Sequence, residues 1–100
     1  MDHRSLRHFL NLAESLHFGR ASEAGHISPS ALSRTIRRLE DEVGAALFDR
    51  NNRSVSLTPA GRLFQEYARD ALNDWESIRG ALMEEAGELR KQLEELKKHL

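Results

Sequence analysis

The sequence predicts a mainly α-helical fold in which three short helices and a small β-hairpin precede one long helix. Two helix starts stand out, because Ser28-Pro29 and Thr58-Pro59 each place a capping hydroxyl directly before a proline. Between them, residues 47–57 hold two short apolar runs around a polar turn, which is typical of a hairpin. Beyond the second start, apolar residues recur every three or four positions to the C-terminus, which is typical of a helix.

The first two helices form the start of the core. Residues 5–16 carry one apolar face and have Asp2 or Ser5 as a cap; the face consists of Leu6, Phe9, Leu10, Ala13 and Leu16. Phe18 and Gly19 interrupt the pattern, and the short, alanine-rich residues 20–25 predict a second helix. Four histidines have no cysteine among them and no HExxH spacing, so we expect solvated or capping imidazoles and no metal site; they are His3, His8, His17 and His26.

The third helix is expected over residues 29–43, from the cap at Ser28 to a stop at Gly44. One face is aliphatic, with Leu32, Ile36, Leu39 and Val43. The other is polar, with Ser30, Ser33, Arg34, Arg37 and Asp41. Such a helix is either an ordinary amphipathic helix or one that reads DNA, so its neighbours must decide.

The neighbours favour DNA. Residues 24–28, AGHIS, can turn the chain tightly between the second and third helices, which predicts a helix-turn-helix. In the hairpin, Arg50 and Arg53 flank two asparagines at an exposed tip, where they can reach phosphates or a minor groove. Three helices followed by such a hairpin make a winged helix-turn-helix, which we assign to residues 1–58.

The long helix begins after Thr58 and predicts a partner. Its seam spaces apolar residues alternately by four and three; they are Phe64, Ala68, Ala71, Trp75, Ile78 and Leu82. The first turns can pack on the domain, whereas the outer turns extend beyond so small a core. We therefore expect residues 59–83 to form a linker helix that makes a homodimer.

Composition bounds the class of protein. The chain has 100 residues, 39% of them hydrophobic, and no cysteine, so no disulfide can form. No signal peptide or membrane-spanning run is evident, and a cytoplasmic protein is expected. The net charge of −1 hides an uneven distribution, because residues 1–62 carry nine arginines against seven acids. No glycine-rich phosphate loop and no base beside a nucleophile occur, so neither an enzyme nor a cofactor is expected.

The chain resembles the N-terminal region of the LysR-type transcriptional regulators over residues 3–83. The specific stretches are LRHFLNLAES, ALSRTIRRLE, LF.R and LTPAG at these spacings. The resemblance implies a winged helix-turn-helix with a recognition helix in the major groove, a wing near the minor groove, and dimers formed by antiparallel linker helices on an interrupted palindromic operator.

Residue by residue, the resemblance carries the DNA contacts of the third helix to Ser28, Pro29, Ser30, Ser33, Arg34, Arg37 and Arg38. It carries the wing contact to Arg53. One departure concerns Pro29 and Ser30, where many members have Gln and then Pro, so the base contact of that glutamine cannot be transferred.

The C-terminal part departs from the family as well. Members continue into an effector-binding domain, whereas residues 84–100 form a coiled-coil-like tail that contains every lysine of the chain. The tail continues a seam of Leu82, Ala86, Leu89, Leu93, Leu96 and Leu100, which changes phase near Gly80 and Gly87. We interpret the tail as a coiled coil grafted in place of the effector domain, and expect no small-molecule effector for this fragment. Glu85 and Arg90 would suit parallel pairing, in conflict with antiparallel linkers, and the sequence leaves this open.

Two functions remain. The first is sequence-specific binding of double-stranded DNA by a dimeric transcriptional regulator. The alternative is a helical oligomerisation module whose basic face is only solvated and which has no specific DNA site.

Overall fold

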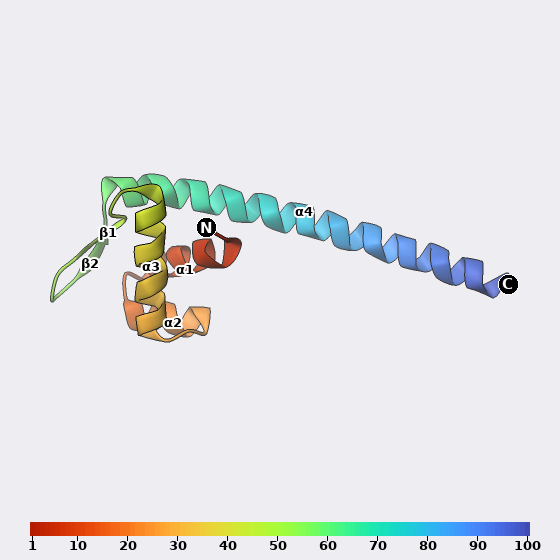
Figure 1. The fold of residues 1–100 in the computed structure, drawn as a ribbon, viewed down its shortest axis with the longest axis horizontal. Helices are drawn as coiled ribbons and strands as arrows, with labels where there is room; N and C mark the ends of the chain where they lie inside the picture. Colours follow the sequence, from red (N-terminus) through yellow and green to blue (C-terminus); the bar gives the residue numbers. More distant parts are fainter.

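The computed structural model describes residues 1–100 and consists of a small domain from which one helix projects (Figure 1). The elements, in chain order, are α1 (His3–Ser15), α2 (Phe18–Gly25), α3 (Pro29–Val43), β1 (Phe48–Arg50), β2 (Val55–Leu57) and α4 (Pro59–Lys98). This confirms the predicted mainly helical winged helix-turn-helix with a long C-terminal helix. The molecule measures 69 × 25 × 20 Å because α4 extends far beyond the domain.

Local capping explains where the first helices begin. Asp2 accepts a hydrogen bond from the backbone N–H of Ser5 at 2.7 Å, so α1 starts two residues earlier than expected. The expected start of α2 at residue 20 was wrong, because Nδ1 of His17 accepts from the backbone N–H of Arg20 at 3.1 Å and the helix begins at Phe18. A histidine cap is outside the usual set of capping residues.

Helix α3 spans the predicted residues 29–43. The Ser28 hydroxyl accepts from the N–H of Ala31 at 3.1 Å, and Pro29 occupies the first turn. At the other end Gly44 adopts a positive φ of 77°, and its N–H donates to the carbonyl of Glu40 at 2.9 Å. Both ends of the helix are therefore fixed by capping residues that could be identified in the sequence.

The core lies where α1, α2 and α3 meet the start of α4. The residues that are buried and apolar are Leu6, Phe9, Leu12, Ala13, Ala21, Leu32, Ile36, Leu39, Leu47, Phe48 and Ala68. Phe9 lies at its centre, edge-on to Phe64 of α4 with ring centroids 4.9 Å apart. The first turns of α4 are thus part of the domain, and their contacts orient α3 and the hairpin.

The hairpin is antiparallel, with Phe48 opposite Leu57 and Arg50 opposite Val55. Thr58 joins it to α4, because its hydroxyl donates to the carbonyl of Ala46 at 2.6 Å and accepts from the N–H of Gly61 at 2.9 Å. Gly61 is buried so close to the carbonyl oxygen of Leu47 that no Cβ would fit. The wing is therefore attached to the start of α4 by backbone packing.

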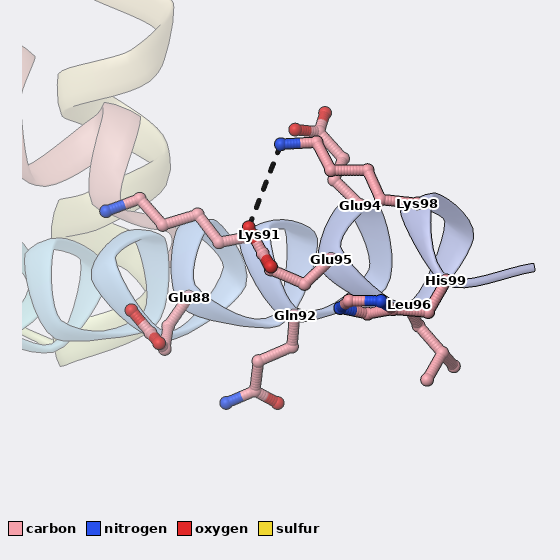
Figure 2. A pocket seen from close by; sticks show the side chains of 8 residues that line it. All are labelled: Glu88, Lys91, Gln92, Glu94, Glu95, Leu96, Lys98 and His99. Carbon is pink, nitrogen blue, oxygen red and sulfur yellow. Dashed lines mark ion pairs between the residues drawn. The ribbon is translucent and has the colours of Figure 1, made fainter.

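Helix α4 runs without a break through Gly80 and Gly87. On its inner side Trp75 stacks on His3 with centroids 4.8 Å apart, and Glu76 pairs with Arg7 at 3.1 Å. Its final turns contact no other element, and Figure 2 shows their charged side chains, including the Lys98–Glu95 pair at 3.8 Å. The hollow among these side chains is an open, mostly polar surface of a single helix, so we assign no site to it.

The dimerisation seam expected from the sequence needs one correction. Ala68 has no exposed surface in the single chain, so the prediction that it meets a partner is wrong. Phe64, Ala71 and Trp75 are half-buried against their own domain. Ile78 and Leu82 are 51% and 57% exposed and remain open to a partner.

Candidate nucleic-acid interface

The N-terminal part of α3 presents most of the predicted DNA-contacting residues on the surface. Ser28 and Pro29 begin the helix, and Ser30, Arg34, Arg37 and Arg38 are exposed along it. Ser33 is half-buried between this surface and the core. In Figure 1 this end of α3 and the hairpin tip both lie on the side of the domain away from α4. The two predicted contact regions therefore share one side of the domain.

The arginines of α3 are free of protein partners. None of Arg34, Arg37 and Arg38 lies within 4.0 Å of a carboxylate, although the protein has five ion pairs elsewhere. A guanidinium left unpaired in this way keeps its fixed set of donors for an external acceptor. Phosphate oxygens and guanine edges are the acceptors in DNA that such a group fits.

The charge order of α3 opposes what helix stability alone would favour. Its first turn holds no acid and its last turn no base, whereas Asp41 and Glu42 lie near the C-terminal end. The helix dipole favours acids near the N-terminus and bases near the C-terminus. An arrangement that forgoes this stabilisation and gathers arginines before acids favours a role in binding an anion.

The hairpin tip is ordered by one asparagine. Oδ1 of Asn51 accepts from the backbone N–H groups of Arg53 and Ser54, at 2.8 and 2.9 Å. The Arg53 side chain forms no ion pair and is exposed. The tip thus holds the backbone at Arg53 in place and leaves its guanidinium free.

Arg50, by contrast, is occupied within the protein. Its guanidinium lies 2.8 Å from Oε1 of Glu40 and 5.5 Å from the centre of the Phe18 ring. Oε2 of the same Glu40 accepts from the N–H of Leu47 at 2.8 Å. The structure therefore assigns Arg50 to attaching the wing to α3 and disfavours the DNA contact expected for it.

His26, for which the sequence predicts a solvated or capping imidazole, is a further residue beside the recognition helix that was not among the predicted DNA contacts. His26 adopts a left-handed backbone with φ of 55° at the turn before α3, and it is exposed. Its side chain forms no hydrogen bond within the protein, so it is available beside the N-terminus of α3. The signal in the sequence was its position between Gly25 and the cap at Ser28.

Neither a metal site nor a membrane span competes with this interface. No three His, Cys, Asp or Glu side chains come together in a way that could hold a metal ion. None of the helices combines the length and the apolar character that crossing a membrane requires.

Comparison with known proteins assigns the family. The family model described as "Bacterial regulatory helix-turn-helix protein, lysR family" matches residues 3–62. The chain belongs to the LysR family. The HTH-type transcriptional activator IlvY of Salmonella typhimurium is 46% identical over 93 residues, which cover 93% of this chain and 32% of the relative. The SDS degradation transcriptional activation protein of a Pseudomonas species is 48% identical, over 89% of this chain and 30% of that protein.

Solved LysR-family structures share the fold. The BenM DBD in complex with benA site 1 DNA has a TM-score of 0.80 and 34% identity, over 86% of this chain and 97% of that one. Vibrio fischeri DarR in complex with DNA has a TM-score of 0.80 and 38% identity, over 84% of this chain and 29% of that one. This chain therefore spans about a third of its curated relatives and nearly all of the BenM DBD.

The same comparison bears on the tail. A match that leaves 7 of the 100 residues unaligned takes in at least ten of the seventeen residues 84–100. The tail thus has a partial counterpart in a natural LysR-family relative, which counts against the grafted origin expected from its composition.

Proposed function

We propose that this LysR-family chain binds double-stranded DNA in a sequence-specific manner, as a homodimer, and regulates transcription. The observation that carries the proposal is the basic, unpaired surface of α3 around Arg34, on the same side of the domain as the free guanidinium of Arg53. The printed titles of the BenM DBD and DarR structures describe complexes with DNA, which supports this assignment. We propose a cytoplasmic location for such a regulator, and we propose no enzymatic reaction.

We assign each exposed residue a DNA contact according to its position in the domain. The first turns of α3 enter the major groove, where Arg34 donates to a guanine edge or a phosphate. Ser30 and Ser33 reach bases or phosphate oxygens, and Arg37 and Arg38 reach the backbone. Ser28 and Pro29 fix the start of the helix, and the N–H groups of this first turn favour a phosphate. Arg53 binds beside the minor groove.

Dimerisation supplies the second copy of the recognition helix. The exposed apolar side chains of Ile78 and Leu82 on α4 are open to a partner helix. Two copies related by a two-fold axis would read two half-sites of opposite orientation, so the operator is an interrupted palindrome.

Selection of bound duplexes from a random pool tests the proposal. We expect recovery of an interrupted palindrome, and anisotropy titration should then show tighter binding to that duplex than to a scrambled one, with affinity falling as salt rises. The competing function is an oligomerisation module, which the exposed stripe of α4 favours. That function predicts no salt-dependent binding to either duplex, and such a result would refute DNA binding.

A further inference from the structure

A small polar pocket lies between the first half of α1 and the C-terminal end of α2. It encloses about 190 Å³, and its polar lining surrounds one glycine; these residues are Arg4, Arg7, His8, Asn11, Gly25 and His26. No carboxylate lines the pocket, whereas glutamates such as Glu14 and Glu88 line the other two polar pockets of the protein. Its polar side chains are therefore basic or amide groups.

The imidazole of His8 is the buried polar group of this pocket. Only 6% of His8 is exposed, and its Nδ1 has no hydrogen-bond partner within the chain. It is the only buried side-chain nitrogen or oxygen atom of the protein without a partner. Buried polar atoms in proteins are nearly always hydrogen-bonded, because an unpaired one loses its contact with water and gains nothing in return. Nδ1 is thus suited to a partner from outside the chain.

Gly25 leaves room beside this nitrogen. A Cβ at this position would lie 2.5 Å from Nδ1 of His8 and 3.6 Å from Nδ2 of Asn11, so both nitrogens border the space that a side chain would take. Gly25 is the last residue of α2 and does not have a positive φ, so the backbone does not require glycine there. Alanine would favour the helix. The glycine therefore contributes space rather than conformation.

The cations of the pocket are available to a ligand. Arg4 and His26 are exposed, and neither side chain forms a hydrogen bond or an ion pair within the chain. Arg7 donates to Glu76 of α4 at 3.1 Å, which holds its guanidinium beside the pocket and occupies only one of its nitrogens. Guanidinium groups match the oxygens of phosphate and sulfate in both charge and geometry. The pocket therefore has the chemistry of an oxyanion site.

We propose that this pocket binds a phosphate group. Arg4 and Arg7 supply positive charge, Nδ2 of Asn11 donates to one oxygen, and Nδ1 of His8 donates to another. The phosphate group is either a free inorganic anion or part of the DNA backbone, since His26 lies two residues before the Ser28 cap of α3. Only the second source rests on the DNA binding proposed above.

The charge of His8 should respond to the bound anion. Burial first, and then the charge of Arg4, lower the pKa of its imidazole, so His8 is neutral at neutral pH when no anion is bound. The charged and titratable groups around it are Arg4 and Arg7 on α1, Asp2 before α1, His26 after α2, and Glu76 of α4, which pairs with Arg7. A phosphate at Nδ1 favours the charged imidazole, so binding should raise the pKa of His8 and should tighten as pH falls.

A purely structural role for these residues explains less. In that case Gly25 only makes space for His8, and Arg4 and His26 are only solvated. This leaves Nδ1 of His8 without a partner. It also gives no reason why the lining excludes carboxylates in a chain that has 16 acidic residues.

Titration of the full chain with sodium phosphate tests the pocket, with pH fixed and ionic strength held constant by sodium chloride. The imidazole NMR signals of His8 and His26 should shift along a saturating curve. His17 and His99 are internal controls, because they lie outside the pocket and should not respond in this way. Shifts that do not saturate, or that are equal at all four histidines, would overturn the proposal.

Two variants and a matched control test the residues. Arg4→Gln removes one cation, and Asn11→Asp replaces the amide with a carboxylate of the same shape. Each should weaken phosphate binding at least about ten-fold. Arg20→Gln removes an exposed arginine of α2 outside the pocket and should change binding by less than about two-fold. Circular dichroism verifies folding, and Arg4→Gln, at an exposed position, decides the matter if Asn11→Asp unfolds. Equal effects of Arg4→Gln and Arg20→Gln would contradict the site.

Anisotropy titrations with DNA distinguish the two sources of phosphate. If a backbone phosphate occupies the pocket, Arg4→Gln should lower the salt slope by about one, and free phosphate should not shift the His8 signals of the complex. If the ligand is a free anion, the slope is unchanged and His8 still responds in the complex. A lowered slope without saturable phosphate binding to the free chain would overturn the pocket. Failure of all DNA binding would refute the proposed function and leave the phosphate titration of the free chain unaffected.

Discussion

Glu40 of α3 and Arg50 of β1 form an ion pair of 2.8 Å that attaches the recognition helix to the wing. The other carboxylate oxygen of Glu40 accepts from the backbone N–H groups of Leu47 and Phe48, at 2.8 and 3.3 Å. Glu40 therefore attaches the start of the hairpin to α3, in addition to the contacts that Thr58 and Gly61 make between the hairpin and α4. The position of Arg53 relative to α3 depends on this connection.

Glu40→Ala should destabilise the domain by about 1 to 3 kcal/mol, chiefly because it leaves the backbone N–H groups of Leu47 and Phe48 without an acceptor, whereas the Arg50 guanidinium remains partly open to water. Urea denaturation measures the loss. Asp41→Ala, one residue along the same helix and exposed, should change stability by less than about 0.5 kcal/mol. Glu40→Gln retains an amide-oxygen acceptor and should fall between them; equal stability of all three variants would show that the wing is attached by other contacts.

Gly61→Ala should be strongly destabilising, by about 3 kcal/mol or more, since the new Cβ would collide with the backbone carbonyl of Leu47. The strands of the wing or the start of α4 would have to move. Gly87→Ala on the same helix meets no atom within 4 Å and should stabilise by about 0.5 to 1 kcal/mol through helix propensity. Thermal unfolding of the two variants makes the comparison, and a harmless Gly61→Ala would refute the close packing of α4 on the hairpin.

Local signals in the sequence predicted the parts of the fold that are determined locally. Ser28-Pro29 and Thr58-Pro59 fixed the starts of α3 and α4 because capping involves only residues within one turn. The start of α2 was missed because a histidine imidazole made the cap. Contacts between residues of different elements could not be predicted from the sequence pattern. Arg50 was therefore expected to be a free cation of the wing, whereas the fold brings Glu40 of α3 next to it.

Burial explains the remaining errors at the dimerisation seam. Spacing alone placed Ala68 with Ile78 on one helical face, and both positions are indeed apolar. Only the packed domain shows that Ala68 is covered by its own core while Ile78 is open. Residue spacing along α4 therefore could not distinguish the apolar positions that pack into the domain core from those that remain exposed for a partner. DNA contact by the remaining arginines stays a prediction.

Stability should fall as the pH drops below about 6.5 because of His8. Burial, followed by the nearby charge of Arg4, lowers the pKa of His8 from its ordinary value of 6.5, and Nδ1 has no hydrogen-bond partner. The unfolded chain then binds the proton more readily than the folded one, so the stabilisation is complete above the unfolded pKa and is lost as pH falls through the folded pKa. Urea midpoints between pH 8 and pH 5 measure this slope.

The control for His8 is His8→Gln, which cannot titrate and should flatten the slope over that range. Asp2 does not interfere, because its hydrogen bonds with Ser5 lower the pKa of its carboxyl from 3.8, outside the window. A slope that persists unchanged in His8→Gln would assign the pH dependence to another group.

Replacing Arg34 and replacing Arg53 should change DNA binding in different ways. If Arg34 donates to a guanine edge, Arg34→Ala should cost roughly 1 to 3 kcal/mol of binding free energy on the selected duplex and relax the preference for that sequence. Arg53→Ala should weaken all duplexes alike and lower the salt slope by about one, because it binds phosphate at the wing. Anisotropy titrations on matched and scrambled duplexes at several salt concentrations separate the two effects.

Arg69→Ala is the matched control for both arginines. Arg69 is exposed on α4 and forms no ion pair, but it lies outside the surface shared by α3 and the wing. Its loss should leave affinity and salt slope within error of the parent chain, since long-range screening removes most of its field at physiological salt. Sequence-blind losses of equal size for Arg34→Ala and Arg53→Ala would refute base reading by Arg34, and would leave α3 with the role of holding the phosphate backbone.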